Sequence, residues 1–198
     1  MKLQRLARGL WRWTAPHPEW QPPKEKDSPA DWPRDVGCIA YEAHDALVLI
    51  DPLVVDGDYA ALDELARAKP RVAILTTLKW HRRSRDELAR RYDASTSRAK
   101  RALPAGVEAL VIRGAGETMF WIPEHRALVP GDRLLGGPPA LRMCPSSWLR
   151  YLKGFTRDDL REALREQLSE LPIEMVLVSH GEPTLRGGRE ALERALAQ

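Results

Sequence analysis

The segment 71–92 constrains the fold of this chain more than any other part of the sequence. Residues 72–76 read Val-Ala-Ile-Leu-Thr, an apolar and largely β-branched run with the length of a buried strand. A polar loop follows, and Ser84-Arg85-Asp86-Glu87 then has the Ser-x-x-Glu spacing of a capping box, which predicts a helix to about Tyr92. A strand, a loop and a helix in this order are typical of α/β proteins, which bind ligands in loops at the carboxyl ends of strands.

The rest of the chain alternates short apolar runs with two longer amphipathic segments. Two pairs of runs are close enough to predict hairpins, at 36–50 and at 118–129. Asp58 and Thr156 precede helical patterns and are predicted to cap them. Predicted strands lie at 3–14, 36–41, 46–50, 107–112, 118–122, 127–129 and 174–178. Predicted helices lie at 58–68, at 156–171 and from the residue after Gly187-Gly188 to Gln198.

The prolines and charges of residues 15–33 exclude regular structure there. Four of the seven tryptophans nevertheless lie in the first 32 residues, which is unusual for a disordered linker. We therefore predict two parts: residues 1–34, an N-terminal strand and a Pro/Trp-rich extension packed on the domain, and residues 35–198, the domain itself.

Composition excludes several classes of protein. With 198 residues, 43% of them hydrophobic and 30% charged, the chain can bury a core and is not a disordered sequence. The net charge of +3 is too small to indicate a nucleic-acid partner. No apolar run approaches the ~20 residues of a membrane helix, and arginines interrupt the first 12 residues, where a signal peptide would need an apolar core. We expect a cytoplasmic protein without a membrane partner.

Several landmarks fall in a fixed order along the chain. They are Leu49-Ile50-Asp51-Pro52, a helix, the strand Ile74-Leu75-Thr76 with its His-containing loop, Phe120-Trp121-Ile122-Pro123-Glu124, Val129-Pro130-Gly131-Asp132 and Val178-Ser179-His180-Gly181. This order resembles the metallo-β-lactamase superfamily, particularly its glyoxalase-II-like hydrolases, over roughly 35–185. The resemblance implies a four-layer αββα sandwich with metal ions at the strand ends along one edge.

The metal-binding motif of that family is incomplete in this sequence. The family pattern His-x-His-x-Asp-His, placed without gaps after Thr76, falls on Thr77, Lys79, His81 and Arg82. A further family histidine would fall at or near Arg113. The resemblance therefore implies that the full binuclear centre is not kept.

One of the two metal positions retains enough ligands for a single ion. The bridging aspartate of the family matches Asp132 and its last histidine matches His180, while His81 replaces an aspartate. Two histidines and a carboxylate can hold one zinc or iron ion with open positions for water. Taken singly, each of these residues is better explained by a packing or turn role, and it is their shared placement at strand ends that suggests one cleft.

Two functions are compatible with this pattern. In the first, one metal held by His81, Asp132 and His180 supports hydrolysis of a small ester, thioester or amide, and Asp132 orients the water or acts as a base.

In the second, the protein is a metal-free pseudoenzyme that binds a small anionic ligand. Lys79, Arg82 and Arg113 place cations where the family has neutral ligands, and two unit charges ~4 Å apart interact at about 4 kcal/mol at an effective dielectric near 20. Such cations oppose a metal and favour a carboxylate or phosphate. Both functions predict that these three residues line the cleft and contact an anionic small molecule.

Overall fold

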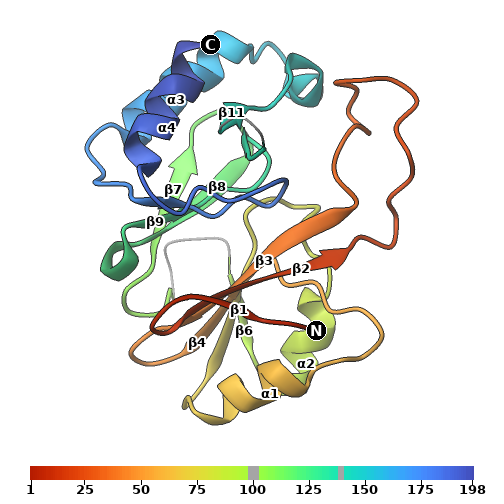
Figure 1. Ribbon diagram of the computed structural model, residues 1–198, viewed down its shortest axis with the longest axis vertical. Coiled ribbons are helices and arrows are strands. Elements are labelled where there is room, and N and C mark those ends of the chain that lie inside the picture. The colour runs from red at the N-terminus through yellow and green to blue at the C-terminus, as the bar shows by residue number, and fades with distance from the viewer. Residues whose placement is uncertain (98–102, 138–140) are drawn as a thin grey trace.

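The computed structural model describes residues 1–97, 103–137 and 141–198. Two β-sheets pack face to face, and helices cover the outer face of each sheet, so the predicted αββα sandwich is confirmed (Figure 1). The first sheet has six strands in chain order, antiparallel from β1 to β4 and parallel from β4 to β6. They are β1 (Gln4–Ala7), β2 (Leu10–Pro16), β3 (Asp35–Glu42), β4 (Leu47–Ile50), β5 (Val72–Leu75) and β6 (Ser95–Ser97).

The second sheet has the strand order β12-β9-β8-β7, and its one parallel pair is β12 with β9. These strands are β7 (Glu108–Ile112), β8 (Glu117–Ile122), β9 (Ala127–Val129) and β12 (Met175–Val176). A small antiparallel pair, β10 (Leu134–Leu135) and β11 (Arg142–Met143), lies between β9 and β12 in the sequence.

Each sheet carries two α-helices on its outer side (Figure 1). The first sheet is covered by α1 (Ala60–Arg67) and α2 (Arg85–Tyr92), and the second by α3 (Arg157–Leu168) and α4 (Gly188–Ala197). Short 3-10 turns occur at Pro123–His125 and Ser146–Leu149. Among the described residues, no helix has both the length and the apolar character needed to cross a membrane.

The alternation of side chains along a strand explains the layers. On β3, Ile39 and Tyr41 point into the core between the two sheets, whereas Cys38 and Ala40 point toward the layer of α1 and α2. This strand is buried on both faces, which accounts for its almost continuous apolar sequence.

The N-terminal residues form part of the first sheet. The predicted strand 3–14 is a hairpin of β1 and β2, which turns at Gly9 with a φ of +72°. β2 then pairs with β3 from Leu10↔Tyr41 to Pro16↔Asp35. The extension that follows is held by indole hydrogen bonds from Trp20 to the Trp32 carbonyl and from Trp148 to the Ser28 carbonyl, both 2.8 Å.

Two of the predicted helix caps are wrong because tertiary partners take the capping side chains. α1 begins after Tyr59 without a side-chain cap, and Asp58 instead pairs with the terminal amino group of Met1. The Ser84 hydroxyl precedes α2, but it accepts from the Val54 amide at 2.9 Å and donates to the Val54 carbonyl at 3.2 Å.

The third predicted cap is confirmed. Thr156 and Asp159 form a reciprocal capping box at the start of α3, in which each side chain accepts from the other residue's amide. No tertiary partner competes for the Thr156 hydroxyl among the described residues, so the local pattern decides the outcome.

Candidate metal centre

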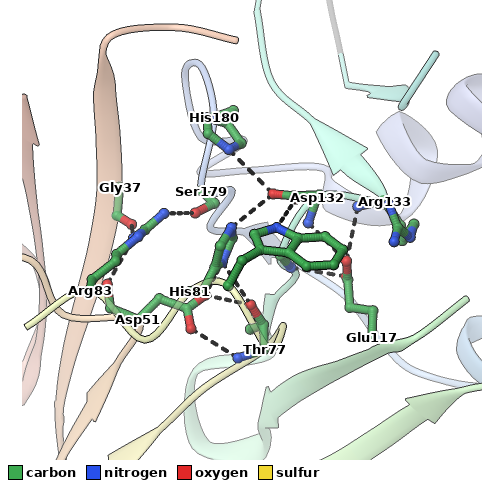
Figure 2. Close-up of polar contacts among 12 residues, drawn as sticks. Gly37, Asp51, Thr77, His81, Arg83, Glu117, Asp132, Arg133, Ser179 and His180 are labelled. Atoms are coloured by element: carbon green, nitrogen blue, oxygen red, sulfur yellow. Dashed lines mark hydrogen bonds and ion pairs between the residues drawn. The ribbon is translucent and has the colours of Figure 1, made fainter. Parts of the chain in front are cut away.

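Four strands from the two sheets end at one edge of the sandwich, and the candidate site lies there (Figure 2). Asp51 directly follows β4, and the loop with His81 follows β5. Asp132 lies three residues after β9, and His180 lies four residues after β12. The strand pairs β4–β5 and β9–β12 are both parallel, so their carboxyl ends bring these polar residues together.

His81, Asp132 and His180 meet as a buried triad. The Oδ1 atom of Asp132 is 3.0 Å from His81 Nε2 and 3.2 Å from His180 Nε2, and the three potential ligand atoms all lie within 4.8 Å of one another. Figure 2 shows both imidazole rings directed at this one oxygen. The structure thus brings together the three residues that the sequence suggested as metal ligands.

The Asp132 Oδ1 atom is the unusual feature of this triad. Neither imidazole contact has hydrogen-bond geometry, so Oδ1 is a buried carboxylate oxygen without a hydrogen-bond partner among the described residues. Ligand atoms at the zinc distances of about 2.0–2.1 Å lie roughly 3.3 Å apart in a tetrahedral site. The two contacts of 3.0 and 3.2 Å are close to that spacing, and all three ligand atoms lie within 4.8 Å of one another, so the triad could hold a single ion.

Asp51 and Thr77 fix the orientation of the His81 ring. The Nδ1 atom of His81 lies 2.8 Å from Asp51 Oδ2 and 3.0 Å from Thr77 Oγ1. Thr77 donates to the same carboxylate through its hydroxyl at 2.5 Å and its amide at 2.9 Å. A carboxylate on the far nitrogen of a histidine is the usual support of a metal-binding imidazole, because it holds the proton on Nδ1 and turns Nε2 to the metal.

Glu117 holds the Asp132 loop in place. This buried carboxylate accepts the amides of Gly131, Asp132 and Arg133 at 2.9, 2.8 and 3.0 Å. Gly131 allows the loop to approach β5, because a Cβ there would lie 2.6 Å from Thr77 Oγ1.

The second oxygen of Asp132 is already bound by the protein. Trp80 donates its indole N–H to Asp132 Oδ2 at 2.8 Å. Only Oδ1 therefore faces the two imidazoles, and the carboxylate has one oxygen to offer a ligand.

Arg83 connects the strands around His180. Its guanidinium donates to the carbonyls of Gly37 at 2.9 Å and Asp51 at 2.7 Å, and to the Ser179 hydroxyl at 2.7 Å (Figure 2). The Gly37 amide also donates to the Ser179 carbonyl at 2.7 Å, which joins β3 to the His180 loop.

Burial and neighbouring charges set the protonation of the triad. Burial alone would lower the pKa of His81, but Asp132 and Asp51 raise it to about 9. Burial would raise the pKa of Asp132, and the two histidines instead hold it well below its ordinary value. Burial also lowers the pKa of His180. Without a metal, the triad therefore carries a protonated His81 paired with an ionised Asp132.

The three cations expected in the cleft are placed elsewhere, which corrects that prediction. Arg82 pairs with Asp86 at 2.5 Å on the surface, Lys79 lies over the Trp80 ring at 5.8 Å, and Arg113 is exposed. None of these three described residues lines the cavity at the triad. The chain turns after His81, so Arg82 points to solvent and Arg83, with a φ of +41°, points inward to the carbonyls of Gly37 and Asp51.

A cavity of about 250 Å³ opens over the triad. Its wall includes the aromatic and arginine side chains Trp32, Trp80, Trp148, Tyr151, Arg83, Arg133 and Arg150, together with the acidic Glu19. These wall residues and the supporting Asp51 and Glu117 were not predicted as site residues from the sequence. A local signal existed for Asp51, which directly follows a predicted strand, and for Trp80, Arg83 and Arg133, which are close in sequence to His81 or Asp132. The others are brought to the site by long-range packing.

The whole chain was compared with known proteins, and solved structures with a similar fold were found. No family model matches the sequence, and no curated protein matches it either. Among solved structures, a metallo-β-lactamase from Erythrobacter litoralis in a mono-zinc form is similar, with 16% identity, a TM-score of 0.64 and coverage of 99% of this chain and 94% of that chain. A metallo-β-lactamase family protein from Thermus thermophilus is also similar, with 17% identity, a TM-score of 0.56 and coverage of 98% and 80%.

A putative diflavin flavoprotein fragment from Nostoc sp. PCC 7120 is similar as well, with 12% identity, a TM-score of 0.57 and coverage of 99% and 94%. Across nearly its whole length, the chain has the metallo-β-lactamase fold. At these identities the likeness concerns the fold, and the chemistry has to be argued from the side chains described above.

Proposed function

We propose that this protein is a mononuclear metal-dependent hydrolase of small esters, thioesters or amides. Its protein ligands would be His81 Nε2, His180 Nε2 and Asp132 Oδ1. The observation that carries the proposal is the buried Oδ1 atom, which lacks a hydrogen-bond partner among the described residues and lies 3.0 and 3.2 Å from the two imidazole nitrogens. The similar Erythrobacter litoralis metallo-β-lactamase was solved in a mono-zinc form, which supports a single ion as compatible with this fold.

The donor set fits zinc or iron(II). Two imidazoles and a carboxylate are ligands that both ions accept, and they leave positions for water and substrate. When bound, either ion would lower the pKa of a water molecule and polarise an acyl carbonyl. The reaction would add one water across the acyl bond and release a carboxylic acid with an alcohol, a thiol or an amine.

The surrounding residues prepare the triad for this role. Asp51 holds the proton of a neutral His81 on Nδ1, which leaves Nε2 free to act as a ligand. Trp80 holds Asp132 Oδ2, and Glu117 fixes the backbone that carries Asp132. A strongly lowered pKa makes Asp132 a weak proton acceptor, so the geometry favours it as a ligand rather than as a general base.

A metal-free anion-binding protein is the second candidate. The observation in its favour is that a protonated His81, with its pKa raised to about 9, balances the charge of Asp132 without an ion. Arg83, Arg133 and Arg150 would then supply the positive wall for a small anionic ligand.

Metal analysis separates the two candidates. The protein is expressed with added zinc or iron, purified without chelator and analysed for metal per chain, then assayed against a panel of small esters, thioesters and amides. The proposal predicts one ion per chain and hydrolysis that a chelator abolishes.

The variants Asp132→Asn and His180→Gln should lose the ion. His44→Gln, at an exposed position on the β3–β4 turn, is the matched control and should keep it. Absence of stoichiometric metal under all loading conditions contradicts the proposal, and thermal stabilisation by a carboxylate or phosphate without metal favours the second candidate.

A further inference from the structure

We propose that the cavity over the triad selects substrates whose acyl or leaving group is a single aromatic ring bearing a carboxylate. This inference rests on the proposed function only in naming the molecule whose bond is cleaved, because recognition of the ring and its carboxylate involves residues that do not bind the metal.

Aromatic rings from separate parts of the chain surround His180. The ring centroids of Trp32 and Trp148 lie 5.8 and 5.9 Å from that of His180, and Trp32 belongs to the N-terminal extension. Trp80 and Tyr151 form an edge-to-face pair at 5.0 Å on the cavity wall. An aromatic ligand can make edge-to-face or offset contacts with such a wall, each worth roughly two- to tenfold in affinity beyond the buried area.

The polar atoms of two of these tryptophans are not available to a ligand. Trp80 donates its N–H to Asp132, and Trp148 donates its N–H to the Ser28 carbonyl. These side chains can therefore offer a ligand only the ring surfaces of their indoles, which suit a flat apolar group.

The size of the cavity suits a ligand of about one ring. An apolar cavity of about 150 Å³ accommodates benzene, and pockets for drug-sized ligands span roughly 300–1,000 Å³. A volume of about 250 Å³ lies between the two, so one ring with a short polar substituent fits.

Arg150 supplies the charge that recognises a carboxylate. Of the three arginines on the wall, Arg83 is bound to backbone carbonyls and Ser179, and Arg133 donates to the Ala115 carbonyl at 2.9 and 3.1 Å. The exposed Arg150 side chain forms no hydrogen bond or ion pair with any other described residue. Its guanidinium is free to pair with a carboxylate in the two-bond geometry that arginine favours.

The test uses three small probes and needs no turnover. Phenylacetate, cyclohexylacetate and benzyl alcohol are titrated by calorimetry into the protein as purified and again after chelation. Phenylacetate should bind at least fivefold more tightly than cyclohexylacetate, which keeps the carboxylate and loses the aromatic ring. It should also bind at least tenfold more tightly than benzyl alcohol, which keeps the ring and loses the charge.

Single substitutions separate the two parts of the recognition. Trp32→Leu, or Tyr151→Leu should the first variant unfold, should reduce the preference for phenylacetate over cyclohexylacetate to less than twofold. Arg150→Met should weaken both carboxylates about tenfold and leave benzyl alcohol unchanged. Arg90→Met, at an exposed position on α2, is the matched control and should bind all three probes as the parent does.

Equal binding of phenylacetate and cyclohexylacetate, or binding of no probe, would overturn this inference. Selective phenylacetate binding by a protein that never takes up metal would sustain it while the hydrolase proposal fails. One bound ion per chain without ring selectivity would contradict this inference and leave the hydrolase proposal standing.

Discussion

The two carboxylate oxygens of Asp132 have different neighbours, a tryptophan for one and two histidines for the other, and this difference defines the site. Trp80 binds Oδ2 at 2.8 Å, which leaves Oδ1 as the single oxygen facing both imidazoles. With Oδ2 bound by Trp80, the Asp132 carboxylate offers one oxygen, Oδ1, to an ion at the site. The Nδ1 atom of His81 is in turn held by Asp51, so the Asp51 carboxylate is expected to affect metal affinity through His81.

Asp51→Asn is expected to weaken metal binding by about 10- to 100-fold, the usual cost of losing the support of a ligating histidine. An amide cannot hold the His81 proton on Nδ1 as a carboxylate does, so Nε2 becomes a poorer ligand. Competition with a chromophoric chelator measures the effect.

Asp158→Asn, whose parent side chain is 88% exposed on α3, is the control and should have the parent affinity. An Asp51→Asn protein with parent affinity would show that the Asp51–His81 contact does not serve metal binding.

Close approach of the Asp132 loop to β5 is the element-scale feature on which the site depends. Gly131→Ala should destabilise the fold by about 1–3 kcal/mol, as overpacking usually does, because the added Cβ would lie 2.6 Å from Thr77 Oγ1 and 2.8 Å from Leu78 Cδ1. The same displacement should lower metal affinity. Urea unfolding and chelator competition measure the two effects.

A substitution at α3 shows whether a loss of metal affinity comes from lower overall stability or from a change in site geometry. Thr156→Ala removes the capping box and should cost about 0.5–2 kcal/mol, with no change in metal affinity, since α3 makes no contact with the triad in the hydrogen bonds described. Equal losses of metal affinity in both variants would mean that Gly131 acts only through global stability.

Sequence patterns predicted the long elements well and the local details less well. The apolar alternation located β3, β4, β5, β7, β8 and β9, because each buries one or both faces. β6 reads Ser-Thr-Ser and has no apolar signal, and β10 and β11 are two residues long. The predicted caps at Asp58 and Ser84 are wrong because partners distant in sequence bind those side chains.

The candidate site shows the same limit. The positions of His81, Asp132 and His180 followed from strand ends, which sequence can locate. The direction of Arg82 and Arg83 depends on a left-handed turn and on carbonyls of β3 and β4, which are distant in sequence. The gap-free alignment therefore placed the wrong arginine in the cleft.

At the scale of the whole molecule, the triad links folding to pH in the metal-free protein. The pKa of His81 is raised to about 9 from the ordinary 6.5, so its contribution to stability is complete below pH 6.5 and is lost as the pH rises through 9. The shift corresponds to a loss of about 3 kcal/mol. Urea unfolding of chelated protein at pH 6, 7.5 and 9.5 should show this decline.

His81→Gln should remove the decline, because glutamine does not titrate. A parent protein whose free energy of unfolding stays level or rises between pH 6.5 and 9, relative to that of His81→Gln, would contradict the assigned His81–Asp132 ion pair.

The most direct measurement of the central claim is X-ray absorption spectroscopy of the zinc-loaded protein. A single-ion centre predicts one zinc per chain with nitrogen and oxygen neighbours at about 2.0–2.1 Å, including the outer-shell scattering of two imidazoles, and no second metal within about 3.5–4 Å. His180→Gln should lose the zinc and, with it, this imidazole signal. A zinc without imidazole neighbours, a zinc bound by sulfur, or a second metal at bridging distance would contradict a single-ion centre built from His81, Asp132 and His180.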